Sequence, residues 1–320
     1  MKKYITPLLL CTLIACAGEE QEPTLVDVIE QEKAEIRAFL AARGSASVTP
    51  IVYLSKKGQV IDTAFLIDHT PATTTPEHGD FILHDYSLRR LDGHYIESTD
   101  PTITADTFRY AVAGPLYLRV DTSKHYDYVA DALARVAPGS TAELIVPSIL
   151  LDKSGTTRHY TLSPHRVIRD LFTHEKALIQ DYLTATNATA TYQDGRGDTL
   201  VHTIIRVPGA GDRLVLPGDT LTIHRTLLVL RSDAPLHEAF SLDTLTTDSF
   251  DPTRVEIPSC GPAFARLREG DEVEFVIPYL LAFNDKPAFH PADARKLIPW
   301  IPPYSTLIYS LKIARLRPKN

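Results

Sequence analysis

Two stretches of the chain place apolar residues at helical spacing, and much of the remainder alternates. Apolar positions recur every three or four residues over 24–43 and again over 164–186, which predicts a helix in each range. Apolar and polar residues alternate instead over 201–230, 271–283 and 306–316, as expected for half-buried strands. The pattern therefore predicts two β-rich regions, each preceded by a long helix.

The two halves of the chain repeat the same landmarks. The sequence EKAEIRAFLAA begins at Glu32, and EKALIQDYLTA begins 143 residues later at Glu175. A second pair, GDFILHDYSL from Gly79 and GDTLTIHRTL from Gly218, follows in the same order at an offset of 139 residues. Two matched landmarks in one order predict an internal duplication with a small deletion.

Each copy also contains one shorter helical candidate, within 126–139 in the first and 261–270 in the second. The expected fold class is α+β, with an antiparallel sheet packed on a short helix and preceded by a longer helix, twice. The segment VPGAGD, residues 207–212, links two alternating runs and lacks the Lys-Ser/Thr pair of a phosphate-binding loop. It is predicted to be a hairpin turn.

The chain begins with a segment typical of secretion. Lys2 and Lys3 precede an apolar run that is too short to span a bilayer, which indicates a signal peptide over 1–15. The sequence LIAC, ending at Cys16, resembles the lipobox of bacterial lipoproteins, and this resemblance implies a lipid on Cys16 followed by a tether over 16–23. An ordinary cleaved signal or a coincidental cysteine is the alternative.

The lipoprotein interpretation predicts an outer-membrane protein, at the periplasmic face or the cell surface. Glu19, Glu20 and Glu22 resemble the export signals of surface lipoproteins of Bacteroidota, although a solvated tether has the same composition. Loss of two lysines with the signal changes the formal net charge from −7 to −9. This charge argues against a nucleic-acid partner and against charge-driven binding to an anionic membrane.

Cysteines and histidines indicate neither a disulfide nor a metal site. Cys11 leaves with the signal and Cys16 is expected to be lipidated, so Cys260 remains alone as a small apolar residue. The 12 histidines form no helical pair with a glutamate and accompany no pair of cysteines. We therefore expect no metal and no cofactor.

The second copy resembles the FKBP family of peptidyl-prolyl cis-trans isomerases over residues 209–316. The resemblance rests on PGDTLTIH, the REGDE turn, VIPYLLAF and the closing IPPYSTLIYSLKIARL. The first copy shares GD…DYSLRRLDG…YIEST and APGSTAELIVP but has no proline-containing flap, so it resembles a degenerate member. The implied organisation is an N-terminal FKBP-like domain over 24–163, a connecting helix over 164–186 and a C-terminal FKBP-like domain over 187–320.

In this family the loop before the last strand overhangs an apolar pocket, and the resemblance places Ile301 there. Rotation about an X-Pro bond crosses about 18–20 kcal/mol and requires no acid, base or metal, so catalysis comes from preferential binding of the twisted amide. The other pocket candidates of the second copy are Phe240, Phe250, Ile257, Cys260, Phe283 and Tyr309. Three residues depart from the family pattern: Cys260 replaces the tryptophan floor, Phe283 the hydrogen-bonding tyrosine, and Arg225 a wall tyrosine.

The first copy retains a different part of the implied pocket. Tyr86 falls at the wall tyrosine and Glu97 at the family's aspartate, whereas Val129 replaces the tryptophan and the region of Asp152 replaces the flap-side tyrosine. The alternative interpretation is that most of the apolar candidates are simply core residues of small sheet domains. No single catalytic residue is assigned.

Two functions remain open from the sequence. The first is a lipid-anchored prolyl isomerase-like folding factor for envelope or secreted proteins, with weak or no catalysis, whose partners are proline-containing polypeptide segments. The second is a non-catalytic FKBP-fold binding or scaffold subunit of an outer-membrane protein complex. The retained loop at Ile301 favours the first, and the three substituted positions favour the second, so enzymatic activity stays undecided.

Overall fold

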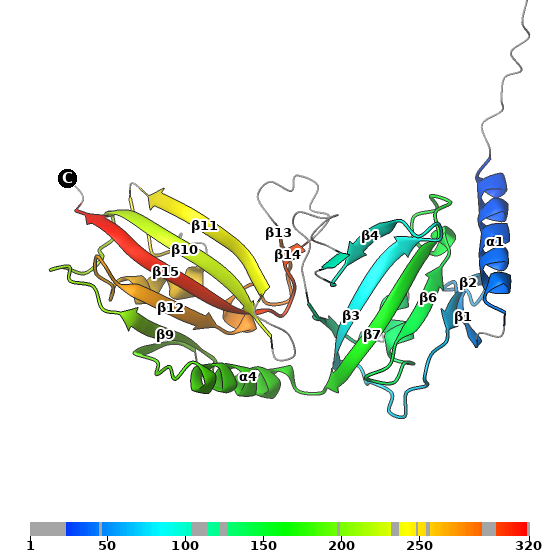
Figure 1. Ribbon diagram of the computed structural model, residues 1–320, viewed down its shortest axis with the longest axis horizontal. Coiled ribbons are helices and arrows are strands. Elements are labelled where there is room, and N and C mark those ends of the chain that lie inside the picture. Colours follow the sequence, from blue (N-terminus) through cyan, green and yellow to red (C-terminus); the bar gives the residue numbers. More distant parts are fainter. Residues whose placement is uncertain are drawn as a thin grey trace, which may run out of the picture.

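The computed structural model describes residues 24–44, 47–100, 102–103, 114–121, 127–196, 199–231, 237–247, 249–253, 257–289 and 299–318. These residues form two large antiparallel β-sheets, one in each half of the chain, and each sheet is packed with helices (Figure 1). The predicted α+β class is therefore confirmed. No helix among the described residues is long and apolar enough to cross a membrane.

The first domain contains a seven-stranded sheet in the order β1-β2-β6-β7-β3-β4, with β5 pairing with one end of β3. Helix α3 covers its inner face and α1 its outer face, since their buried residues belong to separate clusters on the two sides. The elements are α1 (Leu25–Ala42), β1 (Val48–Leu54), β2 (Val60–Ile67), β3 (Phe81–Arg90), β4 (Tyr95–Ser98), β5 (Leu116–Arg119), α3 (Tyr128–Leu133), β6 (Ala142–Val146), the 3-10 helix η1 (Ser148–Leu150) and β7 (Arg158–Ile168).

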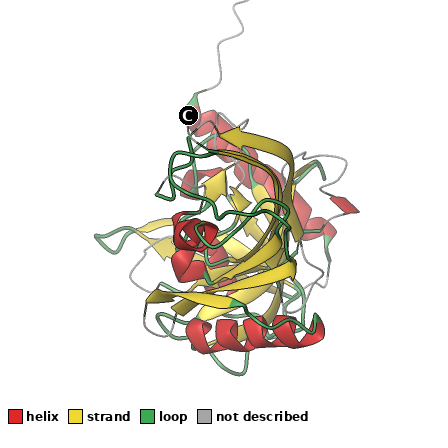
Figure 2. Ribbon diagram, turned by 90° about the vertical axis from the view of Figure 1, so that its left-hand side faces the viewer, coloured by secondary structure: helices red, strands yellow, loops and turns green. Residues whose placement is uncertain are grey.

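The second domain contains a six-stranded sheet in the order β11-β10-β15-β12-β9-β8. Helix α4 lies along its outer face, and the short helix α5 lies on the opposite face (Figures 1 and 2). The elements are α4 (Leu171–Ala185), β8 (Tyr192–Arg196), β9 (Thr199–Val207), β10 (Thr220–Leu230), β11 (His237–Thr247), η2 (Pro258–Cys260), α5 (Gly261–Phe264), β12 (Glu272–Ile277), η3 (Tyr279–Leu281), β13 (Ala288–Phe289), β14 (Pro299–Ile301) and β15 (Thr306–Arg317).

The two sheets share one topology. Reading the second sheet from β8, the order β8-β9-β12-β15-β10-β11 matches β1-β2-β6-β7-β3-β4 strand for strand. Helices α1 and α4 occupy the same place before the first strand of each sheet, and α3 and α5 precede β6 and β12. This correspondence supports the predicted duplication.

The repeated Gly-Asp landmark has the same geometry in both copies. Gly79 and Gly218 have φ values of 96° and 92°, a region that glycine enters without the cost of a Cβ. The aspartate that follows each glycine is buried and accepts a hydrogen bond of 2.8 Å from a backbone N–H three residues earlier, in Asp80 from Glu77 and in Asp219 from Leu216. The landmark therefore encodes a tight turn into β3 of the first sheet and β10 of the second.

The repeated glutamate attaches each long helix to its sheet. Glu32 accepts hydrogen bonds from the Ser148 N–H at 2.6 Å and from the Thr157 hydroxyl at 2.7 Å. Glu175 accepts them from the Tyr279 N–H and from the Thr306 hydroxyl, both at 2.6 Å. Both carboxyl groups are buried. Each one joins its helix to the first residue of a 3-10 helix and to the start of the last strand.

Apolar contacts complete the docking of both helices. On α1, Ile36 packs on Ile67 and Ile145 of the outer sheet face, together with Phe39 and Leu40. On α4, the corresponding contacts form a cluster that consists of Leu178, Ile179, Tyr182 and Leu183 with Ala188, Ile204, Leu228, Leu230, Val276 and Ile308. These contacts dock each long helix on the sheet of its own copy.

The second helix is shorter than predicted. Residues 158–168 form strand β7, and α4 begins at Leu171 with Asp170 as the N-cap, whose carboxylate accepts a hydrogen bond from the Thr173 N–H. The prediction of a helix that begins at Pro164 is therefore wrong. Strand β7 accommodates Pro164 beside a register shift in its pairing with β3, where one backbone N–H is dispensable. The 23-residue helical spacer expected between the copies does not exist.

The helix predicted within 261–270 is also shorter, since α5 ends at Phe264. The segment 207–212 is not a hairpin turn, because β9 and β10 are not neighbours in the sheet. Instead Gly209 packs against the turn before β12, and its N–H donates to the Asp271 carboxylate at 2.6 Å. A Cβ at Gly209 would lie 2.3 Å from the Glu269 carbonyl oxygen, which explains the glycine.

Candidate functional site

Most of the pocket candidates of the second domain lie together in one apolar cluster. Phe250, Ile257, Cys260, Ile301 and Tyr309 are all buried members of the core between the sheet and α5, and Phe283 packs against them. Phe240 lies in β11 opposite Leu227, and its side chain is outside the described part of the structure. The structure therefore brings these candidates together in one buried cluster.

Aromatic rings cross this cluster in a row. The Phe250 and Phe264 ring centroids are 5.4 Å apart, Phe264 and Phe275 5.7 Å, and Phe275 and Tyr309 6.2 Å. Such tilted packing is typical of a well-filled core.

Cys260 lies at the centre of this cluster and is 0% exposed. Burial raises the pKa of its thiol, so the reactive thiolate is disfavoured. The residue behaves as the small apolar group expected from the sequence. Phe283 offers no hydroxyl, so it supplies no hydrogen-bond donor to a bound amide.

The loop after Ile301 connects the cluster to the other domain. Ile301 pairs with Ala288 between β13 and β14 and is buried. The Tyr304 N–H donates to the Asn284 carbonyl at 2.7 Å, which fixes the residues after the two prolines. The Tyr304 ring then meets the Phe81 ring of the first domain edge to face, with centroids 4.9 Å apart.

Tyr304 belongs to an apolar contact between the domains. This cluster contains Phe81, Leu83, Ile168 and Leu171 as buried residues, with Tyr117, Tyr279 and Tyr304 at its margin. Tyr117 of β5 also contacts His174 of α4 through a hydrogen bond of 3.2 Å. The stiff loop before the last strand therefore positions the two domains, a role that its sequence alone does not reveal.

The candidates of the first domain form a more polar site. Tyr86 of β3 donates a hydrogen bond from its hydroxyl to the Glu97 carboxylate of β4. Burial raises the pKa of Glu97, and the bond from Tyr86 opposes that shift; burial also raises the pKa of Tyr86. Both residues are half-buried, and Val129 lines the same cluster. Asp152 is exposed and pairs with Arg158 at 3.2 Å, so it does not join them.

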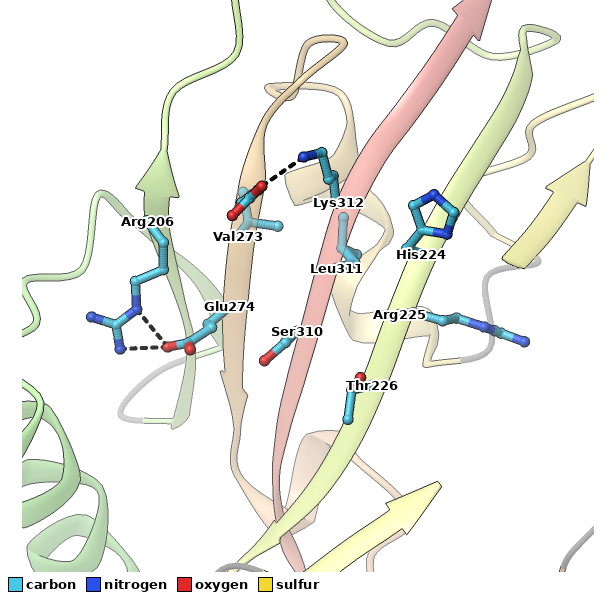
Figure 3. Close-up of a pocket in the computed structure, with 10 residues that line it drawn as sticks. Arg206, His224, Arg225, Thr226, Val273, Glu274, Ser310, Leu311 and Lys312 are labelled. Atoms are coloured by element: carbon cyan, nitrogen blue, oxygen red, sulfur yellow. Dashed lines mark hydrogen bonds and ion pairs between the residues drawn. The ribbon is translucent and has the colours of Figure 1, made fainter. Parts of the chain in front are cut away.

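Arg225 lies on β10 at the margin of a shallow pocket of about 390 Å³ on the second sheet (Figure 3). Two cross-strand ion pairs cross this surface, Arg206 with Glu274 at 2.5 Å and Lys312 with Glu272 at 2.8 Å. The pocket is the polar part of the outer face that α4 leaves uncovered, and its charged groups neutralise one another. It offers no arrangement for proline binding.

Some predictions concern residues outside the described part of the structure. The signal peptide, Cys16 and the tether over 16–23 all lie there. Among the described residues, no group of three His, Cys, Asp or Glu side chains could hold a metal ion. The sequence interpretation missed Glu32 and Glu175 as docking residues, although their place in the repeated EKA motif was a usable signal.

The comparisons with known proteins give structural matches only. No protein-family model and no curated protein matches the chain. Among solved structures, the three FKBP domains of wheat FKBP73 match at 13% identity and a TM-score of 0.31, over 79% of this chain and 94% of that one. FkpA from Escherichia coli matches at 15% identity and a TM-score of 0.31, over 45% of this chain and 62% of that one. The N-terminal domain of Arabidopsis thaliana FKBP42 matches at 14% identity and a TM-score of 0.32, over 41% and 95%.

Proposed function

We propose that the protein is an FKBP-like folding factor that binds proline-containing polypeptide segments of envelope or secreted proteins, with weak or no isomerase activity. The observation that carries this proposal is the position of Ile301, which begins the FKBP-like sequence IPPYSTLIYSLKIARL and belongs to the same buried apolar cluster as Ile257, Cys260 and Tyr309. In this proposal, lipid on Cys16 holds the protein at the membrane.

Weak catalysis follows from the chemistry of the cluster. An isomerase pocket stabilises the twisted amide with an apolar wall and an oriented donor. Phe283 removes the donor, and Cys260 takes the place of the aromatic floor that the family resemblance implies, so the donor and part of the apolar wall are both lost.

A scaffold role is the second candidate, and one contact favours it. Tyr304 on the proline loop packs on Phe81 of the other domain instead of remaining available to a peptide. A fixed pair of domains could hold a partner protein within an outer-membrane complex without turnover. Binding to proline-containing peptides separates the two roles, because only the folding factor requires it.

We expect a protease-coupled prolyl isomerisation assay, on a form that starts after Cys16, to give a rate roughly a hundredfold below that of an FKBP with the tyrosine donor, because one oriented donor in a dry site contributes about that factor. Phe283→Tyr should raise the rate. Cys260→Trp should instead lower the melting temperature, since Cys260 is 0% exposed and a larger ring overpacks the core. A wild-type rate equal to that of the full-signature enzyme would refute the proposal. Absence of any peptide binding would leave the scaffold role.

Lipid attachment has its own test. We expect mass spectrometry of the wild-type protein to show acylation at Cys16, because the residue follows the lipobox-like LIA sequence. The Cys16→Ser protein should lack the lipid and leave the membrane fraction, since stable anchoring depends on acyl chains. Cys260→Ser is the matched control and should keep the lipid. Absence of an acyl mass on Cys16 of the wild-type protein would contradict the lipid anchor.

A further inference from the structure

The beginning of α1 and the turn between β1 and β2 lie at the same end of the first domain. At the opposite end of α1, Arg43 forms an ion pair with Glu143 at 2.6 Å, and Glu143 lies opposite Ile67, the last residue of β2. The beginning of α1 therefore points the other way, where Val28 lies against Gly155. Strand β2 is antiparallel to β6, so its first residue, Val60, lies toward that same end.

Exposed apolar side chains gather around the β1–β2 turn. We call this surface the hairpin patch and define it by Val52, Leu54, Val60 and Ile61, which are 51%, 49%, 65% and 36% exposed. Leu54 and Val60 are directly paired across the two strands. Leu25 and Val26, at the beginning of α1, are 51% and 68% exposed at the same end of the domain. Apolar groups concentrated in this way indicate a contact surface.

The turn that carries the hairpin patch is well formed. The Ser55 N–H donates to the Gln59 carbonyl at 2.7 Å, and the Gly58 N–H donates to the Ser55 carbonyl at 2.8 Å. Lys56 and Lys57 occupy the exposed tip between these bonds. The apolar side chains are therefore flanked by two long cationic ones, which can reach polar groups while their stems stay in apolar surroundings.

We propose that the hairpin patch docks on the lipid surface to which the protein is anchored. This inference rests on the proposed lipid at Cys16. The eight residues 16–23 separate that lipid from α1 and span at most roughly 28 Å at about 3.5 Å per residue, so the beginning of α1 stays near the bilayer. The hairpin patch lies at that same end. Its apolar side chains enter the interface, and Lys56 and Lys57 meet lipid phosphates.

The geometry favours a lipid surface over pairing with another chain. Strand β1 is the edge of its sheet and contains Pro50, whose missing N–H weakens pairing with an added strand. Apolar side chains beside lysines match the layered chemistry of a membrane interface. Docking would hold the first domain against the bilayer. The second domain lies on the side of the first domain opposite α1 (Figure 1).

A polarity-sensitive fluorophore tests the inference in the full chain. The protein is reconstituted in phosphatidylcholine vesicles and labelled at Gln59→Cys, and the matched control carries the label at Gln193→Cys on the exposed β8–β9 hairpin of the second domain. We expect blue-shifted emission and quenching by a lipid-borne quencher at residue 59 only. Cys260 is buried and should not react. A label at residue 59 that stays in water on a membrane-bound protein overturns the docking but leaves the lipid anchor intact.

Substitutions and a second arm separate docking from anchoring. In the residue 59 background, Leu54→Asp with Val60→Asp should reduce the docked-to-undocked ratio at least about tenfold, because two apolar side chains leave the interface. Val207 and Leu214 are exposed apolar residues of the second domain. Val207→Asp with Leu214→Asp should therefore leave the docked-to-undocked ratio unchanged. If Cys16 carries no lipid, the test uses a chain with Cys11→Ser and Cys16→Ser that is labelled at residue 59 and mixed with preformed vesicles. Absence of an emission shift from this label then overturns docking. A shift that needs no vesicles and grows with protein concentration indicates self-association and also overturns it.

Discussion

Replacing Ile179 and Leu183 by aspartate is expected to destabilise the second domain by several kcal/mol. Ile179 is buried in the cluster between α4 and the outer face of the sheet, and Leu183 packs against that cluster. Truncating one large core side chain costs about 2–5 kcal/mol, and a carboxylate there adds the cost of burying charge. The loss should appear as a lower free energy of unfolding in urea for the second domain only.

Two exposed positions of the same helix provide the control. Gln180→Asp with Thr184→Asp adds the same charge to α4 but leaves the cluster intact, so its stability should stay close to wild type. The Ile179 and Leu183 variant should also become sensitive to limited proteolysis between 171 and 185. α4 is a free linker, and its docking contributes little, if two results are found together. Both double variants have the same melting temperature, and the protease cuts α4 of the wild-type protein as readily as α4 of the Ile179 and Leu183 variant.

The contrast between α1 and α4 shows what the sequence could supply. The first helix was predicted over 24–43, and it spans 25–42 because Thr24 forms a capping box with Asp27 at the point where the apolar pattern begins. Before the second helix the apolar pattern continues through Ile168 and Leu171, which are both buried in the contact between the domains. Ile168 ends strand β7 and Leu171 begins helix α4. Because both are buried in the same contact, the strand pattern and the helix pattern look like one continuous pattern in the sequence.

The site divides in a similar way. The family resemblance placed Phe250, Ile257, Cys260 and Tyr309 together, and in the structure they share one apolar core. Whether that core opens toward a ligand depends on packing density, which no pattern reveals. The contact of Tyr304 with Phe81 depends on how the two domains are placed relative to each other. The hydrophobic pattern of one copy carries no information about the position of the other copy.

Substituting the buried glutamates should have a comparably large effect. Glu175→Ala removes the acceptor of two hydrogen bonds and leaves the Tyr279 N–H and the Thr306 hydroxyl without it. An orphaned buried polar group costs about 1–3 kcal/mol, so we expect the second domain to lose roughly 2–5 kcal/mol of unfolding free energy. Glu32→Ala should do the same to the first domain through Ser148 and Thr157.

The glutamine variants and an exposed glutamate make this expectation specific. Burial raises the pKa of Glu175, and its bonds to Thr306 and Tyr279 oppose that rise, so the carboxylate is held by accepting hydrogen bonds rather than by an ion pair. Glu175→Gln keeps one acceptor oxygen and should recover part of the loss. Glu35→Ala, an exposed residue of α1, should change stability little. Equal melting temperatures of Glu175→Ala and Glu35→Ala would show that the repeated glutamate contributes no more to stability than a surface residue does. The docking of the two long helices would then rest on their apolar contacts alone.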